Sequence, residues 1–188
     1  MSRLPMLLAC AALALPAATA RADEASPDAA LDAFQSLCSA TGGDYAAVVK
    51  AADAGGWAAT AEPTDADDTI VVNEKAARAK TDNGETLTLF ATSGVRHGAG
   101  GDIPVSTCKI SSNKPDADLL AHTQAWLGYA PDSGDAGLAV YYVKSASPKP
   151  THVGKDGVGA AMAAGSVSVV KVQQDPNGAI LVYQTFHK

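Results

Sequence analysis

The sequence predicts an α+β fold in which two helices precede an antiparallel sheet. Apolar residues recur at helical spacing before residue 56. After Thr69 the chain changes to short apolar runs that are separated by turn residues. The regular alternation of strands and helices that accompanies a parallel sheet is absent. We therefore expect an N-terminal helical hairpin, an antiparallel sheet of about five to six strands, one inserted helix and a C-terminal β-hairpin.

Residues 1–22 have the build of a secretory signal peptide. Arg3 supplies a positive charge, residues 4–18 form an apolar run, and the A-x-A pattern that ends at Ala22 offers a cleavage site. We expect cleavage before Asp23, which would deliver the protein to the periplasm or to the outside of the cell.

The two other interpretations of this segment are a membrane anchor and a lipoprotein signal. An anchor needs about 20 strongly apolar residues, whereas this run is short, rich in alanine and interrupted by Pro5 and Pro16. A lipoprotein cut before Cys10 would leave the apolar residues 11–18 on the product. We therefore expect no membrane span after cleavage and no lipid on Cys10.

Cleavage leaves residues 23–188, a length that suits a single α+β domain. The whole chain has 14 basic and 20 acidic residues, and the loss of Arg3 and Arg21 changes its net charge from −6 to −6 − 2 = −8. Basic residues do not cluster, which argues against nucleic acid and anionic membranes as partners. The expected partner is an envelope protein or a small ligand.

Two cysteines, Cys38 and Cys108, remain after Cys10 leaves with the signal peptide. An even pair in an oxidising compartment is expected to form a disulfide. The bridge would close a loop of about 70 residues, for which the chain-entropy model gives roughly 4 kcal/mol of stabilisation. The alternative is a pair of buried free thiols.

Turn and capping residues divide the mature chain into its elements. Residues 26–38 and 44–54 have the caps and apolar spacing of helices, and the short connection between them predicts the helical hairpin. A third helix is expected to start at Pro115 and to end at Gly128. The expected strands and turns are a strand from Thr69, a hairpin turn at 82–84, a strand at 86–91, a glycine-rich loop at 94–101, strands at 105–110 and 138–143, and a closing hairpin of 167–172 and 180–186.

Several of these residues together resemble an uncharacterised family of small exported proteobacterial proteins. The resemblance rests on Phe34-x-x-x-Cys38 in the first helix, Gly56-Trp57 after the second, Cys108 on a later strand and Leu127-Gly128 at the end of the third helix. It spans most of the mature chain, and its markers are short and structural in kind. It implies an exported single domain and carries over no catalytic residue.

Arg96-His97-Gly98 is the strongest chemical motif in the chain. It is similar to the R-H-G of histidine phosphatases, in which the histidine accepts the phosphoryl group and arginines hold the phosphate oxygens. Against this activity, the motif lies deep in a short chain that lacks α/β alternation, and isolated motifs often match by chance. Arg96 and His97 are the weak catalytic candidates for a periplasmic hydrolase of phosphate esters.

The histidines give no sign of a metal site. His97, His122, His152 and His187 include no two residues at a spacing of three or four, so no helix presents a pair of imidazoles. We expect no metal and no cofactor. The function that we expect is a non-catalytic binding or interaction module of the cell envelope, and the phosphate-ester hydrolase is the alternative.

Overall fold

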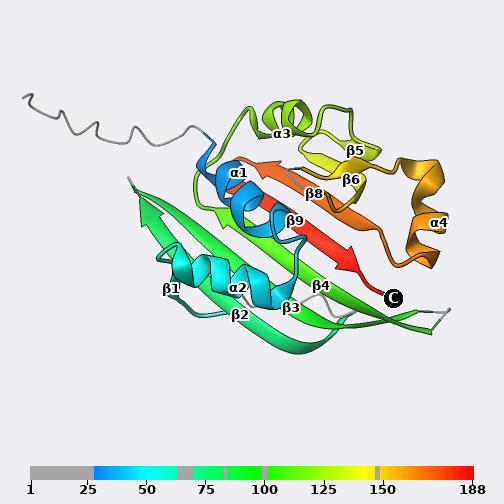
Figure 1. Cartoon of the computed structure of the whole chain (residues 1–188). Coiled ribbons are helices and arrows are strands. Elements are labelled where there is room, and N and C mark those ends of the chain that lie inside the picture. Colours follow the sequence, from blue (N-terminus) through cyan, green and yellow to red (C-terminus); the bar gives the residue numbers. More distant parts are fainter. Residues whose placement is uncertain (1–27, 63–69, 83, 99–100, 147–148) are drawn as a thin grey trace, which may run out of the picture.

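The computed structural model describes residues 28–62, 70–82, 84–98, 101–146 and 149–188 (Figure 1). The expected signal peptide at residues 1–22, the cleavage point before Asp23 and the lipoprotein alternative at Cys10 lie outside the described residues. No helix within these ranges is both long enough and apolar enough to cross a membrane.

One antiparallel sheet contains all nine strands of the described residues. Its order is β1-β2-β3-β4-β9-β8-β6-β5, and β7 pairs separately with β6. The strands are β1 (Ala58–Ala59), β2 (Ile70–Asp82), β3 (Glu85–Gly98), β4 (Gly101–Ser112), β5 (Ser133–Asp135), β6 (Leu138–Lys144), β7 (Thr151–His152), β8 (Ser168–Asp175) and β9 (Gly178–Phe186).

Strands β2, β3 and β4 form a long meander that is set by tight turns. Asp82 pairs with Glu85, so β2 and β3 form a hairpin at the position that the turn signal predicts. Gly84 has a φ of 76°, a conformation that glycine adopts without strain. The register fixed by this turn carries through the whole length of both strands, apart from one irregularity between Val72 and Glu74.

The last strand enters the middle of the sheet. Strand β9 pairs with β4 on one side and with β8 on the other. Asp175 pairs with Gly178, which places the β8–β9 hairpin where the sequence predicts it. The C-terminal strand therefore joins the β2–β4 meander to the strands that follow residue 133.

Helical segments cover one face of this sheet (Figure 1). They are α1 (Ala29–Ala33), the π-helix η1 (Phe34–Ser39), α2 (Tyr45–Ala54) and α3 (Leu119–Leu127), whereas the segment of the 3₁₀-helix η2 (Lys155–Gly157) and α4 (Val158–Ala163) packs through Ala161 against Val105 and Val169 on the other face. The first two run on without a break and pack on β4 and β9, α2 packs on β2, β3 and β4, and α3 packs on β8.

The main hydrophobic core lies between these helices and the sheet. Alternate strand residues point to this face, and the buried ones include Leu89, Ala91, Cys108, Ile110, Val170, Val172, Leu181 and Tyr183. The helices contribute Leu31, Phe34, Val48 and Leu119. Phe34 is fully buried and contacts the rings of Trp126 and Tyr183. A smaller cluster of Val105, Val167, Val169 and Phe186 lies apart from this core, with Ala161 of α4 packed against it.

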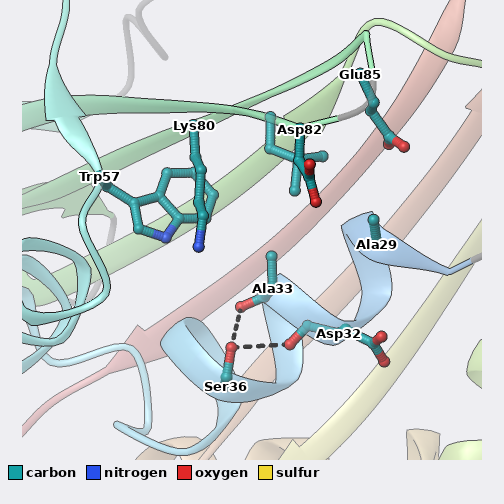
Figure 2. Close-up of a pocket in the computed structure, with 9 residues that line it drawn as sticks. Ala29, Asp32, Ala33, Ser36, Trp57, Lys80, Asp82 and Glu85 are labelled. Carbon is teal, nitrogen blue, oxygen red and sulfur yellow. Dashed lines mark hydrogen bonds between the residues drawn. The ribbon is translucent and has the colours of Figure 1, made fainter. Parts of the chain in front are cut away.

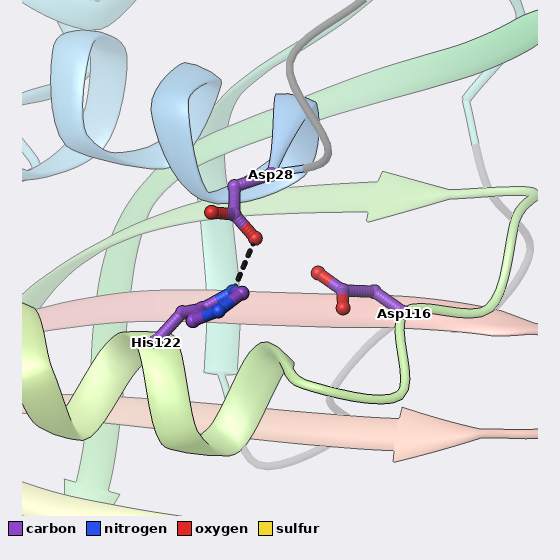
Figure 3. A group of neighbouring side chains, drawn as sticks. All are labelled: Asp28, Asp116 and His122. Carbon is purple, nitrogen blue, oxygen red and sulfur yellow. Dashed lines mark hydrogen bonds and ion pairs between the residues drawn. The ribbon is translucent and has the colours of Figure 1, made fainter.

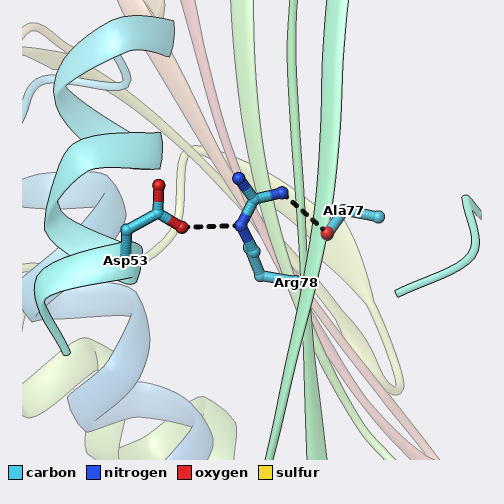
Figure 4. Close-up of polar contacts among 3 residues, drawn as sticks. All are labelled: Asp53, Ala77 and Arg78. Atoms are coloured by element: carbon cyan, nitrogen blue, oxygen red, sulfur yellow. Dashed lines mark hydrogen bonds and ion pairs between the residues drawn. The ribbon is translucent and has the colours of Figure 1, made fainter. Parts of the chain in front are cut away.

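An ion pair adds a polar link between α2 and the sheet (Figure 4). Arg78 on β2 donates from Nε to Oδ1 of Asp53 at 2.7 Å, and its guanidinium also donates to the carbonyl oxygen of Ala77. The hydrogen bond from Arg78 lowers the pKa of Asp53. The link holds the C-terminal end of α2, and with it the chain that leads to Trp57, against β2.

The fold class predicted from the sequence is wrong. Nine strands replace the expected five to six, and they dominate the described residues over four short α-helices. The helices before residue 56 do not form a hairpin. Each packs on the sheet, because the wide apolar face of the strands buries more surface than a second short helix would.

Strand lengths differ most from the prediction at the β3–β4 hairpin. The expected glycine-rich loop at 94–101 is strand at residues 94–98 and at Gly101. Gly94 pairs with Val105 on one side and with Val72 on the other. Pairing with two neighbouring strands therefore overrides the local preference of glycine for loops.

Candidate ligand-binding cleft

A cleft of about 420 Å³ lies between the first helical segment and one end of the sheet (Figure 2). Its volume falls within the range of small-molecule sites. Nine residues line it: Ala29, Asp32, Ala33, Ser36, Trp57, Lys80, Asp82, Glu85 and Leu87.

The helical wall consists of two pairs of residues at helical spacing. Ala29 and Ala33 lie one turn apart, as do Asp32 and Ser36, so all four fall on one side of α1 and η1. The two alanines leave space that larger side chains would fill. The hydroxyl of Ser36 donates to the carbonyl oxygens of Asp32 and Ala33 at 2.9 and 3.2 Å, which occupies its proton within the helix (Figure 2).

The strand wall is a direct result of the β2–β3 register. Lys80 pairs with Leu87, and Asp82 pairs with Glu85. Residues two apart on a strand share a face, so these four side chains lie together on the side that the helices cover. Figure 2 shows the carboxylates of Asp82 and Glu85 and the ammonium of Lys80 pointing from the strands toward the helix.

Trp57 closes one end of the cleft. It follows α2 and precedes β1, and only 8% of its surface is exposed. Lys80 Nζ donates to the carbonyl oxygen of Gly55 at 3.3 Å, so its ammonium is held close to the chain that carries the indole. The cleft therefore has an aromatic wall and a cation at the same end.

Carboxylates outnumber cations in the lining. Glu85 accepts a hydrogen bond from Ser112 at 2.7 Å. Within the described part of the chain, the carboxylates of Asp32 and Asp82 have no hydrogen-bond or ion-pair partner. Three carboxylates and one ammonium line the cleft, so the cleft favours a positively charged group.

The cysteine bridge predicted from the sequence is present. Cys38 on η1 and Cys108 on β4 form a disulfide with a Cα–Cα distance of 5.5 Å. Both residues are fully buried. The bridge ties the helical wall of the cleft to the centre of the sheet.

Arg96 and His97 lie far from this cleft, at the other end of β3. Arg96 pairs with Ile103 and His97 with Asp102, next to the tip of the β3–β4 hairpin. The side chain of His97 is 62% exposed, and its Nδ1 lies 2.6 Å from Oδ1 of Asp102. Neither residue lines the cleft. Phosphate-ester chemistry at His97 stays a prediction of the sequence, which an assay of wild type beside His97→Ala would test.

His122 belongs to a cluster with Asp28 and Asp116 in which one atom of each lies within 4.8 Å of the others (Figure 3). The residue types suit a divalent metal. However, Nδ1 of His122 is 2.5 Å from Oδ1 of Asp28, closer than the roughly 3.3 Å that separates two ligands of one tetrahedral zinc ion. We therefore describe the contact as an ion pair. Its hydrogen bond with Asp28 raises the pKa of His122.

Sequence reasoning missed the cleft, although part of its signal is present. A Lys-x-Asp and a Glu-x-Leu pattern flank the Asn-Gly turn, and a two-residue turn places both patterns on one face. The position of α1 opposite this face depends on the tertiary fold, and no local sequence pattern predicts it.

Comparison with known proteins adds no further information on the cleft. No family model, no curated protein and no solved structure matches the chain.

Proposed function

We propose that this chain is an exported, non-catalytic binding module of the cell envelope, and that the cleft is its ligand site. The observation that carries the proposal is the cleft itself. A cavity of about 420 Å³ with an aromatic wall and a few polar groups has the form of a small-molecule site.

The chemistry of the lining supports binding without a reaction. Ser36 is the only hydroxyl among the nine lining residues, and it donates to the helix backbone. The same nine residues include neither histidine nor cysteine. Nucleophilic catalysis by a hydroxyl needs a base that accepts its proton, and Ser36 donates that proton to backbone carbonyl oxygens instead.

The disulfide supports export. A buried bridge between Cys38 and Cys108 is consistent with an oxidising compartment outside the cytoplasm. We propose that residues 1–22 act as the signal peptide and that the mature protein is periplasmic or secreted. Mass analysis of the protein recovered from the periplasm and the medium tests this, with Asp23 expected as the first residue.

Octan-1-ol is a suitable probe of the cleft, because its hydrocarbon chain has a simple shape and carries no charge. The chain has two tryptophans, so a Trp126→Phe background leaves Trp57 as the only fluorescent indole. We expect octan-1-ol to change the Trp57 emission in a saturable way. Ala33→Leu, which fills the helical wall, should abolish this saturable change.

The matched control is Ala46→Leu, at an exposed site on α2 that does not line the cleft. It should leave octan-1-ol binding unchanged, and circular dichroism should show that both variants are folded. Absence of saturable binding in the wild-type background, or equal binding after Ala33→Leu, would refute the assignment of the cleft as the ligand site.

A further inference from the structure

We infer that the ligand of the cleft is a primary amine on an extended hydrocarbon body. This inference rests on the proposed function and specifies the chemical class of its ligand. Two features carry it: the charge of the lining and the unequal distribution of that charge along the cleft.

The negative charge lies at the hairpin end of the cleft. Asp82 and Glu85 form the last pair of β2 and β3 before the turn, and both carboxylates point toward the helix (Figure 2). Asp32 adds a third carboxylate from the opposite wall. Because the carboxylates of Asp32 and Asp82 accept no hydrogen bond within the described residues, a ligand cation would meet carboxylates that are not already engaged.

The other parts of the lining are apolar. Ala29 and Ala33 lie on the helix, and Leu87 and Trp57 lie across from them. Lys80 is held at the Trp57 end by the carbonyl oxygen of Gly55, where its charge disfavours a second cation. The arrangement therefore fits one ammonium among the carboxylates and a hydrocarbon chain that extends toward Trp57.

A matched set of three probes tests this class of ligand. Octylamine, octan-1-ol and octanoate share one hydrocarbon chain and differ in the charge of the head group. In the Trp126→Phe background, we expect octylamine to bind about tenfold more tightly than octan-1-ol, since each screened contact with a carboxylate adds a factor of about two to five. Octanoate should bind most weakly of the three.

Variants of the lining separate charge from shape. Asp82→Asn should weaken octylamine about two- to fivefold and leave octan-1-ol unchanged. Lys80→Met should strengthen octylamine, because it removes the only cation of the lining. Asp156→Asn changes an exposed carboxylate on η2 outside the cleft and is the control.

The outcomes distinguish this inference from the proposed function. Equal binding of the three probes, or an amine preference that neither Asp82→Asn nor Asp32→Asn reduces, would overturn the amine assignment and leave the cleft as a binding site. Failure of all three probes to bind would overturn both proposals.

Discussion

Cys38 and Cys108 are 70 residues apart in the sequence, and their disulfide joins the π-helix η1 to the central strand β4. Strand β4 pairs with β3 and β9, which connect it to both halves of the sheet. The bond therefore fixes the helical wall of the cleft to a strand in the middle of the sheet.

Removal of this disulfide should destabilise the protein strongly. For a closed loop of this length the chain-entropy model gives about 4 kcal/mol. We expect Cys38→Ala/Cys108→Ala to lose an amount of this order in free energy of unfolding, measured by urea denaturation. Wild type in the presence of a reductant is the control and should approach the double variant. A loss below about 1 kcal/mol would contradict the structural importance of the bridge.

A thiol count of the purified protein tests the bridge and the proposed cleavage together. Denatured but unreduced protein should contain no free thiol, because Cys38 and Cys108 are bonded and Cys10 is expected to leave with the signal peptide. One thiol would indicate that Cys10 is retained. Two thiols would show that the bridge does not form.

The His122–Asp28 ion pair predicts a pH-dependent contribution to stability. The hydrogen bond with Asp28 raises the pKa of His122 above its ordinary value of 6.5, and the charge of Asp116 acts in the same direction. A group whose pKa is higher in the folded state binds its proton more tightly there. The stabilisation that the protonated His122 contributes is therefore fully present below the pKa of this residue in the unfolded chain. It is lost as the pH rises through the pKa of His122 in the folded protein.

Urea denaturation of wild type and His122→Gln at about pH 5.5 and about pH 8.5 measures this effect. We expect wild type to exceed the variant at the lower pH and the difference to shrink at the higher pH. A difference that is constant or grows with pH would be inconsistent with a protonated imidazole at this contact.

Gly94 is required by the close approach of β2 to β3. A Cβ atom at this position would lie 2.3 Å from the carbonyl oxygen of Val71 and 3.1 Å from Cγ2 of Ile70. The site is next to the irregular pairing between Val72 and Glu74. Gly94→Ala should therefore destabilise the fold by about 1–3 kcal/mol, because the strands must separate locally.

Gly98→Ala is the matched control in the same strand. A Cβ atom there would lie 3.6 Å from its nearest neighbour, an ordinary van der Waals distance. We expect its effect on the urea midpoint to be much smaller than that of Gly94→Ala. Equal effects of the two substitutions would indicate that the close approach of the Val71 carbonyl oxygen does not restrict position 94 to glycine.

Local chemistry explains which features could be predicted from the sequence. The β2–β3 and β8–β9 hairpins form where they are predicted, because the conformation of a tight turn depends on the few residues within it. Gly128 ends α3 with a φ of 87° for the same reason. The cysteine pair was predictable because only two cysteines follow the proposed leader.

The features that were missed depend on distant contacts. The three-residue and two-residue strands β5 and β7 exist only through their pairing with β6. The full lengths of β2, β3 and β4 reflect mutual pairing rather than β-propensity, as the glycines of residues 94–101 show. The cleft requires both the β2–β3 register and the placement of α1 against these strands, so no single segment of the sequence predicts it.

Three of the five tyrosines should lose their phenolic protons at a higher pH in the folded protein than in the unfolded chain. Burial raises the pKa of Tyr129 from 10.0 to about 12, with a further contribution from the charge of Asp132. Desolvation also raises the pKa values of Tyr141 and Tyr183. In the unfolded chain these phenols ionise near pH 10. The folded state therefore keeps protons that the unfolded state releases, and its stability falls as the pH rises above about 10.

Absorbance of the phenolate at 295 nm, followed together with far-ultraviolet circular dichroism, measures this titration. We expect the folded protein to show a late rise in phenolate absorbance, at a pH above the ordinary tyrosine pKa of about 10. Tyr129→Phe should reduce the amplitude of this late rise, and the urea-unfolded chain should not show it. The late phase should coincide with the loss of the folded circular dichroism signal, because ionisation of a buried phenol favours unfolding. Ionisation of Tyr129 near pH 10 in a protein that is still folded would show that its hydroxyl is open to water and that the packing of Tyr129 against Tyr141 is looser than described.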